Sequence, residues 1–110
     1  MKSLLPSLKE RKRYLAFEVM SKDNTRFSVV SKAVWSSILS FIGTKGAAKA
    51  GIWLLSDKYK NNKGLIRVGH KYVDDLKASL ALIKNIDSED VIVRSLGVSG
   101  ILNKAEVYLK

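Results

Sequence analysis

Apolar and polar positions change their period along the chain, and the changes predict successive elements. Residues 13–21 alternate between two faces, which predicts a half-buried strand. From residue 26 to 42 apolar side chains recur every three or four positions, which predicts an amphipathic helix. Gly43 suits the left-handed position that ends such a helix. The apolar residues on one face of the strand are Leu15, Phe17 and Val19.

The rest of the chain predicts three more strands, a second helix and a short C-terminal helix. The order strand–helix–strand–strand–helix–strand is typical of an α+β, ferredoxin-like or RRM-like fold with a four-stranded antiparallel sheet. Two helices are expected on one face of this sheet, and no segment is expected over the other. The expected strands are 52–56, 65–69 and 91–96, the helices are 72–84 and 101–109, a polar hairpin loop covers 57–64, and turns cover 87–90 and 97–100.

Composition indicates one domain, residues 1–110, with a strong basic surplus. Lys and Arg number 20 against 10 Asp and Glu, which gives a net charge of +10. The pI is near 10.0. This surplus favours a polyanionic partner, with nucleic acid first and an anionic membrane surface second. The absence of cysteine excludes disulfides and thiolate metal sites.

Nothing in the sequence predicts a membrane or secretory segment. The longest uncharged stretch, residues 33–44, is too short to span a bilayer. The first eight residues have no long apolar core, so they do not resemble a signal peptide. We therefore expect a cytoplasmic protein with no membrane partner.

A basic cluster joined to the first strand is the main candidate site. Residues 1–12 form a basic lead-in, and four of the five residues 9–13 are cations. Because these cations enter a folded strand, they are held in place and are suited to bind phosphates. A solubilising terminus is the alternative, which the recurrence of positive charge along the chain disfavours. The four cations are Lys9, Arg11, Lys12 and Arg13.

Further candidate RNA contacts are spread over the later loops and strands. Tyr59, in the hairpin loop, either stacks on a base or lies along the surface. The sequence Gly-Val-Ser-Gly at 97–100 is simplest as a tight turn, but it also places backbone N–H groups before a helix, where phosphates bind. The candidates are Lys58 and Lys60 in the loop, Arg67 on the third strand, and Arg94, Ser99 and Lys104 around the turn.

Catalysis, metal binding and base stacking are poorly supported. The single histidine, His70, has no cysteine or second histidine to work with, and it is simplest as a polar junction residue. The expected third strand has no aromatic residue, and Tyr14 and Phe17 lie on opposite faces of the first. Trp35 and Trp53 are interpreted as core anchors. We therefore expect no catalytic residue, no metal and no bound cofactor, and recognition by phosphate contacts and RNA shape.

Three segments together resemble one family. They are LPSLKERKRYLAFEV (5–19), YVDDLKASLALI (72–83) and VRSLGVSGILNKA (93–105). In this order they are similar to the archaeal ribonuclease P protein component 2 family, whose eukaryotic relatives serve ribonuclease P and ribonuclease MRP. One departure is Ile101, where the family often carries Thr.

The resemblance implies a small RRM-like subunit without catalytic residues of its own. In that family the RNA subunit removes the 5′ leader of precursor tRNA with magnesium ions. The protein pairs with the TIM-barrel subunit, ribonuclease P protein component 3, and two pairs form a heterotetramer that supports the catalytic domain of the RNA. Two alternatives stay open. One is a stand-alone or ribosome-associated RNA-binding protein, and the other is a ligand-binding ferredoxin-like module, which would need a polar pocket.

Overall fold

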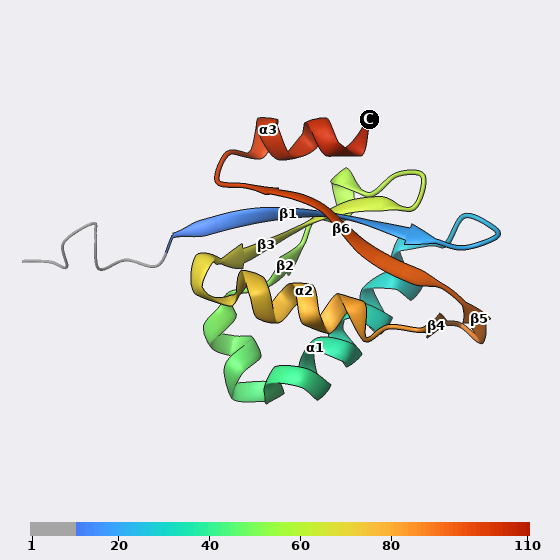
Figure 1. Cartoon of the computed structure of the whole chain (residues 1–110), viewed down its shortest axis with the longest axis horizontal. Helices are drawn as coiled ribbons and strands as arrows, with labels where there is room; N and C mark the ends of the chain where they lie inside the picture. The colour runs from blue at the N-terminus through green and yellow to red at the C-terminus, as the bar shows by residue number, and fades with distance from the viewer. Residues whose placement is uncertain (1–10) are drawn as a thin grey trace, which may run out of the picture.

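The computed structural model describes residues 11–110 and contains a four-stranded antiparallel sheet with helices on both faces (Figure 1). The sheet order is β2-β3-β1-β6, so β1 is a central strand. This order and the alternation of strands and helices confirm the predicted α+β class. The strands are β1 (Lys12–Met20), β2 (Trp53–Leu54), β3 (Lys63–Gly69) and β6 (Ile92–Ser99).

One face of the sheet holds the main hydrophobic core. The helices α1 (Phe27–Ala50) and α2 (Val73–Ala81) cover it. The side chains predicted to share this face of β1 are at most 2% exposed, which confirms the predicted alternation. They pack with residues from both helices because the apolar stripe of each helix faces the sheet. The central members of this cluster are Leu15, Phe17, Val19, Val34, Ile38, Leu76 and Leu80.

The first helix is longer than its sequence predicts. Gly43 does interrupt it, with φ 76° and ψ 169°, but the chain then resumes a helical path to Ala50. The left-handed end lies at Gly51, with φ 61° and ψ 42°. The expected connector is helical because Ala47 and Ala50 are buried in the core, where their packing offsets the cost of the break.

By length and composition α1 also meets the criteria for a membrane span, with a mean hydropathy of 1.3 over its most apolar window. Its inner stripe, which includes Val30, Val34 and Ile38, is instead packed against the sheet. We therefore interpret α1 as a core helix, broken at Gly43.

The second face of the sheet is partly covered by α3 (Leu102–Glu106) and the turn η4 (Val107–Leu109), as Figure 1 shows on the side opposite α1 and α2. Ala105 is fully buried there with Ala16 and Leu65. Any Cβ at Gly97 would overlap the ring of Tyr108, so a glycine is needed beneath that ring. The expectation that no segment covers this face was wrong, because a single short helix supplies the cover.

The last strand runs further than expected. Residues 97–99 continue β6, and they pair with Tyr14, Leu15 and Ala16 of β1. An irregularity in register between Ala16 and Phe17 accommodates the extension. The predicted turn at 97–100 is therefore wrong over three of its four residues, because pairing with a central strand overrides the turn preference of glycine.

The remaining short elements connect the helices to the sheet. Residues expected to be a loop after α2 form a small hairpin, in which Asp87 and Ser88 have positive φ values of 54° and 67°. These elements are η2 (Ser56–Lys58), η3 (His70–Tyr72), β4 (Asn85–Ile86) and β5 (Glu89–Asp90).

Candidate nucleic-acid interface

Cations gather at one end of the sheet, where β1 begins and β3 and β6 end. Lys12 lies opposite Gly69, and Arg13 lies opposite Val68. Tyr14 lies between Arg67 of β3 and Ser99 of β6. The turn η3 follows β3 directly and adds another cation. We call these residues the basic end: Arg11, Lys12, Arg13, Arg67 and Lys71.

His70 holds the start of the basic end in place. The backbone N–H of His70 donates to the carbonyl of Arg11 at 2.7 Å. The N–H of Arg11 in turn donates to His70 Nδ1 at 3.2 Å. His70 is thus a polar junction residue, as predicted, and its contacts fix the backbone from which the Arg11 side chain projects.

The side chains of Lys12 and Arg13 lie along the sheet end. A Cβ at Gly51 would be 2.7 Å from Lys12 Nζ, so the Lys12 chain reaches across toward the end of α1. Arg13 Nη1 donates to the carbonyl of Lys12 at 3.0 Å and lies beside Gly100. Two salt bridges occur among residues 11–110, and neither involves the basic end.

Other predicted contacts lie at the opposite end of β1 and are paired with carboxylates. Arg94 Nη2 and Nε lie 2.9 and 3.0 Å from Glu18 Oε1. Lys58 forms a salt bridge with Glu106, and that hydrogen bond raises the pKa of Lys58. We call Glu18, Arg94, Lys58 and Glu106 the paired end. Lys60 lies near it, in the hairpin opposite Lys63.

The three remaining predicted contacts are not brought into one site. Ser99 Oγ accepts a hydrogen bond from Ile101 N–H at 3.1 Å, so its hydroxyl closes the turn before α3. Lys104 is exposed on α3, on the second face of the sheet. Lys9 lies outside the described residues.

Tyr59 is a structural residue and not a free stacking platform. Its hydroxyl donates to the carbonyl of Thr25 at 2.7 Å, and its ring packs against Phe17 and Phe27. Burial raises the pKa of Tyr59. Both alternatives raised from the sequence, a base-stacking ring and a loose surface ring, are therefore replaced by a ring built into the core edge.

Trp53 is the residue whose position the sequence analysis missed. It was interpreted as a core anchor, but its side chain is 58% exposed on β2, whereas Trp35 packs against the core as expected. The guanidinium of Arg67 lies 5.7 Å from the centre of a Trp53 ring. The sequence around Trp53 is apolar throughout, so it does not distinguish the inner positions of a two-residue edge strand from the outer ones.

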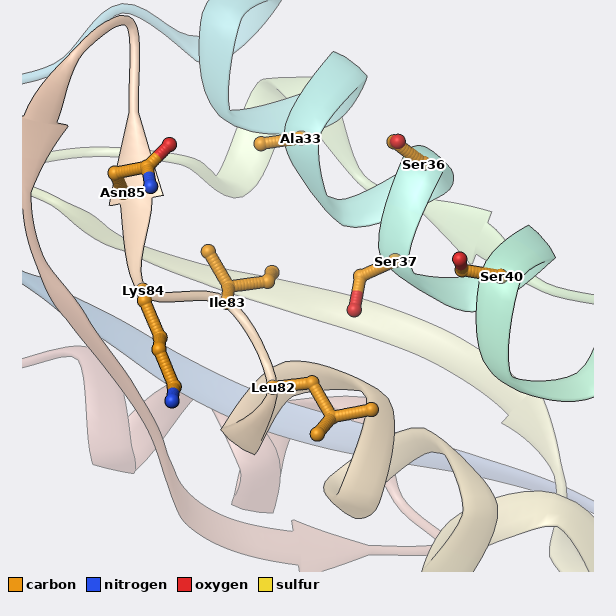
Figure 2. Close-up of a pocket in the computed structure, with 8 residues that line it drawn as sticks. All are labelled: Ala33, Ser36, Ser37, Ser40, Leu82, Ile83, Lys84 and Asn85. Atoms are coloured by element: carbon orange, nitrogen blue, oxygen red, sulfur yellow. The ribbon is translucent and has the colours of Figure 1, made fainter.

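An open groove between α1 and the segment after α2 is the candidate for a small-ligand site (Figure 2). It has a volume of about 450 Å³ and is lined by serines of α1 and by residues 82–85. Ser37 Oγ already donates to the carbonyl of Ser79 and ties the two helices together. Lys84 is the one charged residue along its lining, and it is exposed. This groove gives the ligand-binding alternative little support.

Acidic groups do not assemble a metal site in the part of the chain that the structure describes. No group of three or more His, Asp or Glu side chains there has the arrangement to hold an ion. Asp74 and Asp75 lie in the first turn of α2, where they complement the helix dipole. That the chain binds no metal or cofactor stays a prediction.

Comparison with known proteins places this architecture in a family. The Rpp14/Pop5 family model matches residues 13–110. The chain is 38% identical to ribonuclease P protein component 2 of Thermococcus gammatolerans over 103 residues, which covers 94% of this chain and 86% of that protein. It is 39% identical to the protein of the same name from Methanosarcina mazei, covering 96% and 89%.

A solved structure supports the same fold. A chain in the cryo-EM structure of yeast ribonuclease MRP superposes with a TM-score of 0.53 and 16% identity, covering 92% of this chain and 87% of that one. The sequence matches span nearly all of the chain and include every element of the sheet. The chain therefore belongs to the Rpp14/Pop5 family, as its sequence resemblance predicts.

Proposed function

We propose that this chain is a protein subunit of ribonuclease P that binds the RNA subunit through its basic end. In this role it supports the catalytic RNA that removes the 5′ leader from precursor tRNA. The chain contributes no catalytic group and no bound cofactor, and the magnesium ions belong to the RNA. Family membership and the names of the archaeal relatives support the assignment to this complex.

The observation that carries the RNA-binding part is the unpaired charge of the basic end. Its five cations have no carboxylate within salt-bridge distance among residues 11–110. They are mounted on the ends of β1 and β3 and on η3, and their positions are fixed by backbone pairing. Cations held in this way neutralise phosphates without first losing a protein partner. They lower the repulsion where RNA strands crowd together, and therefore the magnesium that the RNA needs.

We further propose that the chain assembles with the TIM-barrel component 3 subunit, as two pairs in a heterotetramer, in the cytoplasm. The family resemblance supports this pairing. The helix layer also exposes large apolar side chains that suit a protein partner. On α1 and just after α2 these are Leu39, Phe41 and Leu82, each 44–54% exposed.

The test is cleavage of a precursor tRNA by reconstituted archaeal ribonuclease P, with this chain present or omitted. We expect omission to raise the magnesium concentration needed for cleavage, and the Arg11→Glu/Arg13→Glu variant to restore activity poorly. The reconstitution includes the component 3 subunit, so its co-purification with this chain is measured in the same experiment. Cleavage that is unchanged on omission would refute the subunit role and leave general RNA binding as the better reading.

A further inference from the structure

One row of residues crosses the second face of the sheet beside the basic end. Trp53 pairs with Arg67, Arg67 with Tyr14, and Tyr14 with Ser99, so these four residues lie side by side on β2, β3, β1 and β6. Side chains two positions along these strands, Leu55, Leu65 and Ala16, pack under α3. Because alternate residues share a face, the row lies on the α3 side of the sheet.

The helix α3 does not cover this row at its outer edge. Trp53 is 58% exposed, while the neighbouring row around Ala16 and Leu65 is buried. An exposed indole on a sheet normally costs solubility, so its position suggests a contact. Neighbouring strands lie roughly 4.8 Å apart, so Trp53 and Tyr14 are separated by about 10 Å, with Arg67 between them.

Arg67 is held flat between the two aromatic residues. Its guanidinium lies 5.7 Å from the centre of the Trp53 ring, within cation–π distance. Its Nε is buried and has no hydrogen-bond partner among residues 11–110. The stacking geometry thus fixes the plane of the guanidinium by ring contact, which leaves its terminal N–H groups to an incoming acceptor.

The charge around the row favours a polyanion over a protein side chain. The four strands carry a single carboxylate, Glu18, which lies at the other end of β1 and is paired with Arg94. Lys12 lies two residues before Tyr14, on the same face and beside the row. An aromatic ring surrounded by cations is the arrangement that binds single-stranded nucleic acid, in which bases stack and phosphates pair with cations.

We propose that Trp53 stacks on one unpaired base of the RNA, while Arg67 and Lys12 bind the phosphates on either side of it. This proposal rests on the proposed function and adds a base contact to what is otherwise a phosphate-binding surface. It also corrects the expectation that the sheet lacks a stacking platform. The platform differs from the expected RRM arrangement because its aromatic ring stands on the edge strand.

The first test uses Trp53 as its own reporter. In a Trp35→Phe variant, which leaves Trp53 as the only indole, a single-stranded adenylate octamer is added at low salt. We expect quenching of the Trp53 emission by the octamer, and much less by a blunt RNA duplex. Quenching that is equal for the duplex, or absent at concentrations where the octamer is bound or fails to bind, would overturn the proposal.

The second test compares Trp53→Ala with Ile92→Ala, which removes a 63% exposed apolar side chain from the other end of the sheet. We expect Trp53→Ala to weaken binding of the octamer and of the ribonuclease P RNA on the order of tenfold, without changing the salt slope. Ile92→Ala should leave binding unchanged. Circular dichroism confirms that each variant is folded.

The two proposals fail in different ways. If Arg11→Glu/Arg13→Glu loses RNA binding while Trp53→Ala keeps it, the phosphate surface stands and the base contact is wrong. If Trp53→Ala instead loses only the component 3 subunit, the indole is a protein contact and the base-stacking proposal is overturned. If both variants bind RNA like the original chain, the proposed function fails with it.

Discussion

The two ends of β1 both carry cations, but the cations have different surroundings. At the basic end they have no carboxylate partner among residues 11–110, whereas at the paired end Arg94 contacts Glu18 and Lys58 contacts Glu106. A cation that is already paired projects a weaker field, so it attracts phosphate less. The comparison teaches that a net charge of +10 does not locate an RNA site, and that the pairing of each charge does.

The largest effect is expected from reversing charge at the basic end. Arg11→Glu/Arg13→Glu should weaken binding to the ribonuclease P RNA on the order of 100-fold, because two phosphate contacts become repulsive. The slope of log K against log salt should fall by about 1.4 to 1.8, at 0.7 to 0.9 per contact. Filter binding at several salt concentrations measures both quantities.

A matched control places the same charge change at the other end. Lys22→Glu/Lys60→Glu lowers the net charge equally, and both of these lysines are exposed and distant in sequence from the basic end. This variant should lose much less affinity than the first. Equal losses would show that RNA responds to total charge, and the distinction between the two ends would collapse.

Near the paired end the polar residues are expected to matter for stability instead. Asn62 is 8% exposed, and its side chain binds Thr25 N–H at 2.7 Å and the carbonyl of Asp23 at 3.1 Å. Asn62→Ala should lower the free energy of unfolding by about 2 kcal/mol, since buried partners lose their hydrogen bonds. Chemical denaturation measures the change, and RNA affinity should stay constant.

Asn61→Ala is the control for that substitution. Asn61 and Asn62 both have positive φ, 53° and 63°, but Asn61 is exposed. The control therefore carries the backbone strain without the buried hydrogen bonds. If both variants are destabilised equally, the strain and not the network explains the loss.

The sequence predicts the fold well where hydrophobic period and burial agree. The alternation of Leu15, Phe17 and Val19 identifies both β1 and its inner face, because one side of a central strand must be buried. The sequence fails where tertiary packing overrides local preference. Gly97 reads as a turn residue, yet it belongs to β6, because the ring of Tyr108 needs a position without a Cβ.

The candidate site is predictable only in part. The cluster Arg11–Arg13 is contiguous, so its anchoring by β1 follows from the sequence. That Arg67 joins this cluster depends on strand register, and that Arg94 does not depends on Glu18, which is 76 residues away in the chain. Trp53 was misplaced because an apolar run of four residues gives no sign of which side chains face solvent.

A smaller effect tests whether pairing silences Arg94. Glu18→Gln removes the carboxylate and leaves the Arg94 charge uncompensated. RNA affinity should rise, by about threefold at most, because one more cation becomes available. The free energy of unfolding should change by less than about 1 kcal/mol, since the Arg94 side chain is 57% exposed. An affinity that falls would show that Glu18 itself helps to position the RNA.

The smallest effect concerns Lys58 and its titration. Its hydrogen bond to Glu106, with the attraction between the two charges, raises its pKa above the ordinary value of 10.5. A raised pKa in the folded state means that this stabilisation is complete below pH 10.5 and is lost as the pH rises through the folded value. Stability near pH 7 should therefore not depend on the Lys58 proton. Glu106→Gln should lower the Lys58 pKa toward 10.5, as measured by NMR titration of its side-chain carbon. A pKa that does not move would mean that the pair does not form in solution, and Lys58 would then join the cations available to RNA.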